Sequence, residues 1–292
     1  MKIGYAIDAF QSLDSDSASA GDDVVSGAQA AYDSDFDYVE CPDHHISDDR
    51  HFFQHLPTAS RLSATFDHVA VMCLLPLYDP VYLAERLGTL DCFVDQLDLW
   101  CAIGGHEPAF DAFDVSFENR AELFDEHLSV IESLTADDEP VFFDGEHVSL
   151  DGVLINPRPD LRVCIGGIAK PAVRRAGRRG DAWVVSVQET DDDLERKLEW
   201  FNDAGGGDVV LRRDALIRDD ATTAAADVES LIQNGYRGWD DPAGRILSGD
   251  PATVADRLEQ YESLGVDDVV ISPVDDAGET VDRFRDVRKY LG

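Results

Sequence analysis

The sequence predicts a TIM (β/α)8 barrel, and two observations predict it. Short, β-prone apolar runs alternate with helical patterns along the whole chain, and this alternation is typical of a parallel sheet. The alternation recurs eight times within 292 residues, which is the size expected of a closed barrel. We therefore predict a single domain that spans residues 1–292.

An open, doubly wound sheet is the competing arrangement for the same pattern. Such sheets often carry a G-x-G-x-x-G motif after the first strand, where it binds a pyrophosphate. No such motif follows the first predicted strand, and residues 205–207 (Gly-Gly-Gly) come after a helical pattern, as a turn would. These two features favour the closed barrel.

Local signals define the elements in chain order. Pro42 cannot donate to a sheet ladder and ends the second strand, and Pro57 suits the first turn of a helix. A near-continuous apolar run closed by Pro76 predicts a strand buried on both faces. The predicted strands cover 2–7, 38–41, 68–75, 97–103, 162–165, 182–187, 209–217 and 269–272. The predicted helices cover 22–32, 57–62, 80–94, 119–134, 171–179, 191–202, 222–234 and 251–264. Residues 12–20 are expected to form a loop, and residues 144–147 a hairpin turn within an irregular segment, 135–160.

The net charge is the strongest compositional signal. The chain has 60 Asp and Glu residues against 24 Lys and Arg residues, a formal net charge of −36 spread over its whole length. Such a surface repels nucleic acids and anionic membranes. Self-repulsion of this size is relieved in molar salt, where the Debye length falls to about 3 Å. We therefore expect a cytoplasmic protein of an extreme halophile.

The cysteines and the amino end agree with that compartment. Five cysteines form no C-x-x-C pair, and most of them lie in apolar runs, which indicates reduced, buried thiols. No stretch has the apolar length of a membrane span, and the first residues resemble a strand, not a signal peptide.

The end of the second predicted strand carries the first candidate site. Asp43, His44 and His45 directly follow the strand, and in α/β folds ligands bind at the carboxyl ends of strands. The alternative interpretation is a turn with two solvated histidines. The other strand ends decide between these alternatives.

Several motifs, taken together in their order, resemble those of the bacterial-luciferase-like superfamily of flavin or deazaflavin oxidoreductases. The resemblance covers nearly the whole chain, although each motif alone is weak. The motifs are Asp-His-His at 43–45, Leu-Leu-Pro-Leu-Tyr-Asp-Pro at 74–80, Phe-Asp-Gly-Glu-His at 143–147, Asn-Pro-Arg-Pro at 156–159, Ile-Gly-Gly at 165–167, Gly-Asp-Ala-Trp at 180–183 and Gly-Asp-Pro-Ala-Thr at 249–253.

The resemblance implies a TIM barrel with insertions at its carboxyl-terminal face, where FMN or the deazaflavin coenzyme F420 lies. His44 matches the family histidine beside the reactive part of the ring, and an imidazole can exchange a proton near neutral pH. Asp43 is expected to orient His44 or tune its basicity. We assign both residues as catalytic.

The resemblance also implies cofactor-binding residues. A non-proline cis peptide that bulges against the ring is expected near Val71, Met72 and Cys73. Gly104 and Gly105 are expected to let the backbone approach the ring closely. A luciferase has an arginine for the flavin phosphate where this chain has Gly104, so the sequence departs from FMN-binding members there.

Two further assignments follow from the resemblance. The turn formed by Gly166, Gly167, Ile168 and Ala169 resembles the family's phosphate-binding turn, since free N–H groups at a helix start suit a phosphate. Alternatively, the two glycines only form a tight turn at the end of the strand. Glu107 matches an acidic residue that lies over the ring in some deazaflavin-dependent members.

The predicted function is therefore a luciferase-like oxidoreductase that acts on a small organic substrate, by monooxygenation with FMN or by hydride transfer with coenzyme F420. The alternatives are a catalytically silent flavin-binding barrel and a metal-dependent hydrolase. The histidine spacing matches no zinc signature, so we predict no metal site. By resemblance we expect a homodimer formed through the early helices, and a flavin or F420 reductase is a candidate partner. Three phenylalanines either wall the substrate pocket or pack under a loop: Phe110, Phe113 and Phe117.

Overall fold

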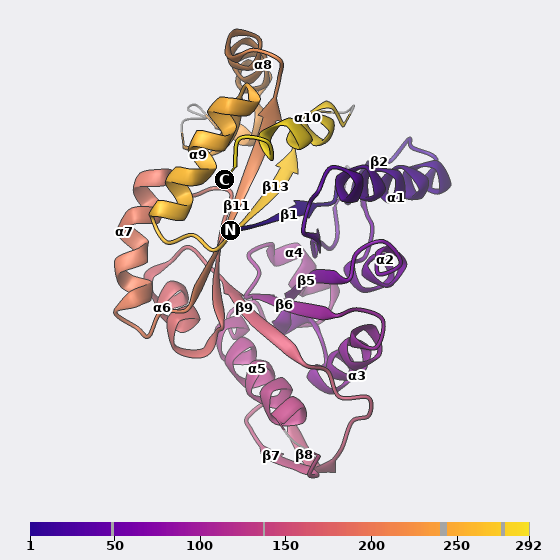
Figure 1. The fold of residues 1–292 in the computed structure, drawn as a ribbon. Helices are drawn as coiled ribbons and strands as arrows, with labels where there is room; N and C mark the ends of the chain where they lie inside the picture. Colours follow the sequence, from indigo (N-terminus) through magenta and orange to yellow (C-terminus); the bar gives the residue numbers. More distant parts are fainter. Residues whose placement is uncertain (48–49, 137, 240–243, 276–277, 292) are drawn as a thin grey trace. The chain divides into compact units, whose positions relative to one another are not determined.

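The computed structural model describes residues 1–47, 50–136, 138–239, 244–275 and 278–291 (Figure 1). Among these residues, eight parallel strands close into a barrel, because β10 pairs with both β9 and β11. The predicted fold class is thus confirmed. The barrel strands are β1 (Lys2–Ala6), β3 (Tyr38–Cys41), β5 (His68–Leu74), β6 (Gln96–Ala102), β9 (Leu161–Gly166), β10 (Ala182–Val185), β11 (Asp208–Ile217) and β13 (Asp268–Pro273).

A helix lies between each strand and the next, and most boundaries agree with the sequence patterns within a few residues. The helices are α1 (Ser17–Asp33), α2 (His55–Leu62), α3 (Pro80–Asp91), α5 (Arg120–Ala136), α6 (Lys170–Arg179), α7 (Asp191–Asn202), α8 (Ala221–Gln233) and α9 (Pro251–Ser263). The predicted loop at 12–20 is wrong in its second half, because α1 begins at Ser17. The Asp16 carboxylate accepts the backbone N–H of Ser19 at 2.9 Å and caps the helix there.

Several short elements carry no usable sequence period and were not predicted. The strands β2 (Phe10–Ser12) and β4 (Arg50–Phe52) pair antiparallel, and β12 (Ile246–Gly249) extends the sheet beside β11. The helix α4 (Glu107–Ala112) was also missed, and so was α10 (Glu279–Val287), although the buried residues of α10 recur at helical spacing: Thr280, Val281, Phe284 and Val287. The predicted hairpin is present as β7 (Val141–Asp144) and β8 (Ser149–Val153).

The chain forms two compact units. Unit 1 contains residues 1–8, 21–40 and 165–292, and unit 2 contains residues 9–20 and 41–164. The prediction of a single domain stays a prediction.

Unit 1 contains a charged side chain in its interior. Arg213 on β11 is completely buried, with its Nε 3.2 Å from the Tyr261 hydroxyl, its Nη1 2.9 Å from the Arg212 carbonyl and its Nη2 3.2 Å from Asp191. A buried guanidinium is tolerated only when its donors are satisfied and its charge is paired. Its partners Asp191 and Tyr261 belong to α7 and α9, so this cluster ties both helices to β11 (Figure 1).

Unit 2 is built around the parallel pair β5 and β6, which stay in register from His68 opposite Gln96 to Leu74 opposite Ala102. The β7–β8 hairpin is tied to α5 by one carboxylate. Glu126 accepts backbone N–H bonds from the hairpin turn, at 2.8 Å from His147 and 3.2 Å from Glu146.

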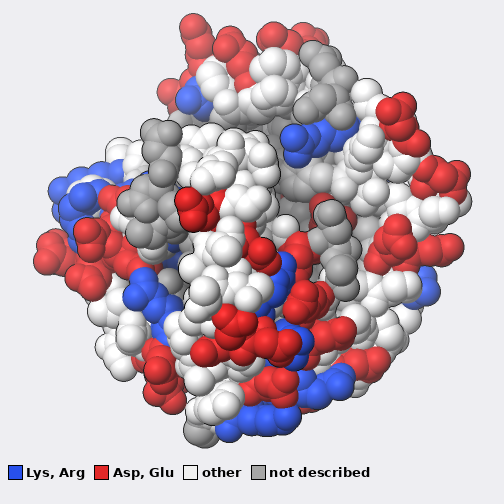
Figure 2. All heavy atoms as spheres, turned by 90° about the horizontal axis from the view of Figure 1, so that it is seen from above, with Lys and Arg blue, Asp and Glu red and all other residues white. Residues whose placement is uncertain are grey.

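The surface is strongly acidic. Figure 2 shows red carboxylate side chains distributed over one face, with blue basic side chains between them. Among the helices that the structure describes, none is long and apolar enough to cross a membrane.

A buried polar network joins the amino-terminal halves of β5, β6 and β9. The Asp98 carboxylate is fully buried and lies 3.2 Å from His68 Nε2 and 3.0 Å from Arg162 Nη1, and it accepts the Gln96 amide at 2.8 Å. Burial acts to raise the pKa of Asp98, but the hydrogen bonds and charges of these partners outweigh it and lower the pKa. At the amino-terminal face of a barrel, such a network serves stability.

We expect Asp98→Asn to lower the free energy of unfolding by about 3 kcal/mol near neutral pH, because it removes a fully buried carboxylate that pairs with the half-buried Arg162. The pKa of Asp98 is lower in the folded state than in the unfolded state, where it is about 4. The contribution of Asp98 to the free energy of unfolding is therefore complete above about pH 4, and it is lost as the pH falls through the folded-state pKa. Urea unfolding from pH 7 down to pH 3 measures this difference. The exposed Asp95→Asn is the matched control, and an equal effect of both variants would contradict the assignment.

Candidate active site

A pocket of about 370 Å³ lies in unit 2 at the carboxyl ends of β5 and β6. It is lined by residues 43–47 after β3, by Phe52, by Leu74 at the end of β5, and by residues 104–106, 109 and 110 after β6. Four residues assigned from the sequence thus line one pocket: Asp43, His44, Gly104 and Gly105.

The Asp43 carboxylate is buried behind this pocket and is held by two hydrogen-bond donors. The backbone N–H of Leu74 donates to Oδ2 at 2.8 Å, and the Tyr78 hydroxyl lies 2.8 Å from Oδ1 and 2.9 Å from Oδ2. Tyr78 directly follows a 3₁₀ turn, Leu75–Leu77, that Pro76 starts at the end of β5. Asp43 therefore attaches the segment after β3 to the end of β5.

Two histidines approach the same carboxylate. His45 Nε2 lies 2.9 Å and His55 Nδ1 lies 3.3 Å from Asp43 Oδ1. Burial acts to raise the pKa of Asp43, but hydrogen bonds and charge from His45 and His55 outweigh it and hold that pKa well below its usual range. Asp43 is thus ionised at neutral pH. The sequence-based idea that it orients His44 stays a prediction.

The cluster extends from His55 into the strand β5. The Cys73 sulfur lies 3.4 Å from His55 Nε2, and burial raises the pKa of the Cys73 thiol well above its usual value. Cys73 therefore keeps its proton and packs as a buried thiol.

The expected cis peptide at Val71, Met72 and Cys73 is wrong. In the part of the chain that the structure describes, the only cis peptide bond joins Asn156 and Pro157. The three residues lie in the middle of β5, where each pairs in register with β6 in a regular parallel ladder. They do not line the pocket, whereas Leu74 does. Their role in cofactor binding stays a prediction.

His44 lies at the open side of the pocket. Its imidazole is exposed and packs against two aromatic rings, with centroid distances of 4.8 Å to Phe10 and 5.3 Å to Phe52. These rings belong to the short strands β2 and β4. The missed antiparallel pair therefore supplies the support for the predicted catalytic histidine.

Gly104 and Gly105 follow β6 and differ in the space around their Cα atoms. Gly104 has φ of +83°, and an added Cβ would lie 3.1 Å from the Phe110 ring, so this position needs glycine. At Gly105 an added Cβ would meet no atom within 4 Å, so open space faces this backbone.

Glu107 is exposed as the first residue of α4 and does not line the pocket. The phenylalanines fulfil both predicted roles: Phe110 lines the pocket, while Phe117 packs edge-on against Phe110 at 5.1 Å. Phe113 contacts the His45 ring at 4.8 Å.

The predicted phosphate turn, Gly166 to Ala169, lies in unit 1 and leads into α6. An added Cβ at Gly167 would lie 2.4 Å from the Ala172 side chain, and the Gly167 carbonyl accepts the Trp183 indole N–H at 3.0 Å. Packing alone thus explains Gly167. Ala169 has no side chain that could cap the helix, which leaves phosphate binding by this turn as a prediction.

Sequence reasoning missed Tyr78, His55 and His106 as parts of the site. Tyr78 lies within the motif at 74–80, where the sequence assigns it no role, His55 carries no signal beyond the general histidine spacing, and His106 directly follows the two glycines. Tyr78 and His55 reach Asp43 through tertiary contacts, and no periodic pattern in the sequence signals such contacts. In the described residues, the cluster with metal-ligand geometry is Glu122, Glu146 and His147, all of them exposed.

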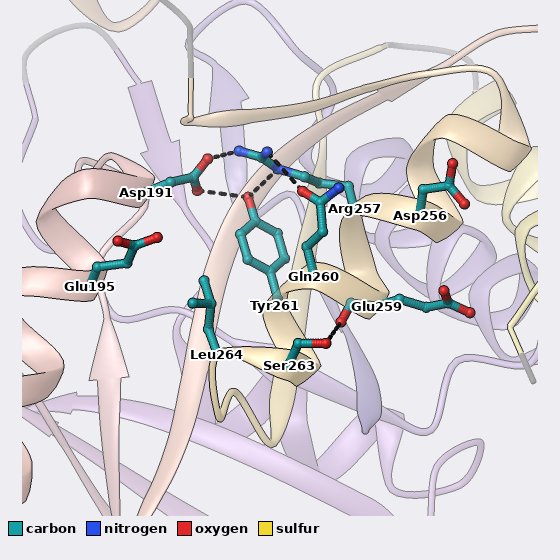
Figure 3. Close-up of a pocket in the computed structure, with 9 residues that line it drawn as sticks. All are labelled: Asp191, Glu195, Asp256, Arg257, Glu259, Gln260, Tyr261, Ser263 and Leu264. Atoms are coloured by element: carbon teal, nitrogen blue, oxygen red, sulfur yellow. Dashed lines mark hydrogen bonds and ion pairs between the residues drawn. The ribbon is translucent and has the colours of Figure 1, made fainter.

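A larger pocket of about 580 Å³ lies in unit 1 between α7 and α9 (Figure 3). Its wall contains the ion pair of Asp191 with Arg257 and the hydrogen bond of the Tyr261 hydroxyl to Asp191, 3.0 Å long. These groups belong to the cluster that satisfies the buried Arg213. This groove lies on the helices and not at the ends of the strands, so we assign its polar groups to the structure of unit 1.

Gly104 and Gly105 allow a matched test, because an added Cβ would press on Phe110 at the first position and would meet open space at the second. We expect Gly104→Ala to cost about 1–2 kcal/mol of folding free energy, because alanine is strained at positive φ and its Cβ presses on Phe110. Gly105→Ala should be neutral or stabilise by up to about 1 kcal/mol. Chemical unfolding of both variants measures the difference, and equal stabilities would contradict this account.

Comparison with known proteins agrees with this architecture. A family model described as luciferase-like monooxygenase matches residues 1–268. Similar solved structures include an F420-dependent secondary alcohol dehydrogenase in complex with an F420–acetone adduct, at 17% identity and a TM-score of 0.78, with 100% of this chain and 99% of that chain covered. The EDTA monooxygenase of Chelativorans sp. BNC1 has 16% identity and a TM-score of 0.79, with 100% and 94% covered. The oxygenating constituent of 3,6-diketocamphane monooxygenase from Pseudomonas putida, in complex with FMN, has 17% identity and a TM-score of 0.78, with 100% and 98% covered. At these identities the solved structures establish the shared fold, and the match of the family model to most of the sequence shows that the chain belongs to the luciferase-like monooxygenase family.

Proposed function

We propose that this protein is a flavin- or deazaflavin-dependent oxidoreductase that binds its ring cofactor in the pocket beside Asp43 and acts on a small organic substrate. The pocket is the observation that carries the proposal. It brings together an ionised carboxylate, three histidines (His44, His45 and His106) and two glycines at the carboxyl ends of neighbouring strands, which is where barrel enzymes perform their chemistry.

The residues of this pocket fit a planar ring. Its volume of about 370 Å³ falls within the range of roughly 300–1,000 Å³ that is typical of small-molecule sites. Leu74 and Phe110 provide apolar contact surface, and the open space next to Gly105 lets a flat group approach the backbone. The structural neighbours named above include one that binds an F420 adduct and one that binds FMN, which supports both cofactor classes.

When bound, the ring would supply a hydride in its reduced form or accept one from an alcohol in its oxidised form, and reduced FMN would supply electrons for oxygen chemistry. The chain's own residues would hold and orient the reactants. His44, supported by Phe10 and Phe52, would hold or release a proton at a ring nitrogen on the open side of the pocket. Asp43 stays ionised behind it and keeps the histidine-bearing segment in position.

The geometry at Gly104 favours the deazaflavin over FMN. The resemblance expects a phosphate-binding arginine at this position, but φ of +83° and the close Phe110 ring disfavour any larger side chain. A chain that cannot place an arginine here lacks that contact to the FMN phosphate. We infer that coenzyme F420 is the preferred cofactor and that hydride transfer is the reaction.

The first experiment is reconstitution in molar KCl with FMN and with coenzyme F420, separately, followed by fluorescence quenching. We expect coenzyme F420 to bind at least ten-fold more tightly than FMN. Gly105→Leu should abolish binding because its side chain fills the open space beside the backbone, whereas Gly105→Ala should retain it. Tight binding of FMN alone would assign oxygen chemistry instead, and binding of neither would favour a catalytically silent barrel.

The role of His44 is tested at constant cofactor occupancy. We expect His44→Ala to change cofactor affinity less than about three-fold but to slow reduction of the bound cofactor by a panel of small alcohols by about 10²–10⁴-fold, as loss of a proton-transferring group does. His51→Ala is the matched control, because His51 is exposed on β4 and does not line the pocket. Equal rates for both variants would remove His44 from the mechanism.

A further inference from the structure

The cluster around Asp43 determines where each of its protons lies. Burial and the adjacent Asp43 carboxylate hold the pKa of Tyr78 well above its usual value, so Tyr78 keeps its hydroxyl proton and donates it to Asp43. The ionised Asp43 can only accept. Each neighbour that faces this carboxylate at hydrogen-bond distance must therefore supply a proton.

This requirement assigns the tautomer of His45. Its Nε2 lies 2.9 Å from Asp43 Oδ1 and 2.8 Å from the Tyr78 oxygen, whose only proton is already donated to Asp43. If Nε2 carried no proton, its lone pair would face a carboxylate oxygen at 2.9 Å, and the two would repel each other. The proton of a neutral His45 therefore lies on Nε2, and Nδ1 is left as an acceptor.

His55 follows the same logic on the other side of the carboxylate. Its Nδ1 lies 3.3 Å from Asp43 Oδ1, which favours a proton on Nδ1, and its Nε2 can then accept the Cys73 S–H at 3.4 Å. Both nitrogens of this buried histidine face protein groups. His45 differs, because it also lines the pocket, and its Nδ1 has no hydrogen-bond partner among the described residues.

We propose that His45 is a ligand-binding residue of this pocket: it presents Nδ1 as the acceptor for a hydroxyl or N–H group of the bound molecule, with Asp43 and Tyr78 as its positioning residues. This inference deepens the proposed function by naming the class of ligand. The pocket selects molecules that carry a hydrogen-bond donor, such as alcohols, over analogues whose oxygen is methylated. A buried acceptor rejects an analogue that lacks the donor, because the acceptor is then left unpaired.

The tautomer is measured on the protein without cofactor, by ¹⁵N-labelled histidine and long-range ¹H–¹⁵N correlation spectra, with His45→Gln used to assign the signals. We expect the Nε2–H form of His45 at pH 7 to 8. Asp43→Asn should increase the Nδ1–H form, because the amide can donate to Nε2. Should that variant not fold, Tyr78→Phe is the second test: it should keep the Nε2–H form, because Asp43 still accepts that proton, and a change to the Nδ1–H form would overturn Asp43 as the positioning residue. Tyr82→Phe, an exposed tyrosine on α3, should leave the spectrum unchanged. An Nδ1–H form in the wild-type protein would overturn the assignment.

The ligand class is tested with phenol and anisole, which differ only by the methylation of one oxygen. We expect phenol to bind about ten-fold more tightly, which corresponds to a hydrogen bond of about 1.4 kcal/mol, and to shift the His45 Nδ1 resonance. His45→Phe should remove this preference, whereas His51→Phe should keep it. Equal affinities in the wild-type protein, or no binding of either probe at millimolar concentration, would overturn the proposal. Neither readout requires a cofactor, so a failure to bind coenzyme F420 or FMN would count against the proposed function alone.

Discussion

The buried carboxylate of Asp43 is the constraint on which the site depends. A charge in the interior costs several kcal/mol unless hydrogen bonds and opposite charges replace its water. Here the backbone of Leu74, the hydroxyl of Tyr78 and the rings of His45 and His55 place N–H and O–H donors 2.8 to 3.3 Å from the carboxylate oxygens. To do so, the segment after β3, the helix α2 and the turn after β5 must all meet at one point. The position of the pocket in unit 2 follows from that requirement.

The same physical rule acts at other buried charges with a different outcome, and Arg213 and Asp98 are two examples. Arg213 in unit 1 and Asp98 in unit 2 are also fully buried and charged, and each is satisfied by groups from neighbouring elements. Neither of them lines a pocket at the end of a strand, so their pairing contributes to stability. Among these three clusters, the one around Asp43 lines a pocket and leaves His45 Nδ1 without a hydrogen-bond partner among the described residues, and our functional proposal rests on this difference.

The glycines after β6 show how the backbone shapes recognition. Gly104 is required by its own conformation and by the Phe110 ring, while Gly105 faces open space. A sequence with an arginine at the first position would need a different loop. Glycine instead of arginine at position 104 is therefore required by the local backbone conformation, and exchanging the side chain alone would not restore the luciferase motif.

Much of the fold was determined by the sequence alone. Regular alternation of apolar strand and helix patterns predicts the barrel because each pattern is local: a parallel strand buried on both faces is a continuous apolar run, whereas a helix buries one face. The strand at 38–41 and its Asp-His-His end were predicted in the same way, as was the pair of glycines after β6. The short strands β2 and β4 escaped prediction because three residues carry no measurable period.

Only the tertiary structure decided which groups meet. Tyr78 and His55 are 35 and 12 positions from Asp43, at no helical or strand spacing. Tyr78 reaches Asp43 because the parallel strands β3 and β5 end at one edge, and His55 reaches it from the start of α2. The regular ladder of β5 likewise replaced the expected cis peptide, since backbone pairing with β6 is a contact between distant residues. Local patterns determine the type of each element and the residues at its end, whereas protons, tautomers and partners depend on distances that arise when the elements pack together.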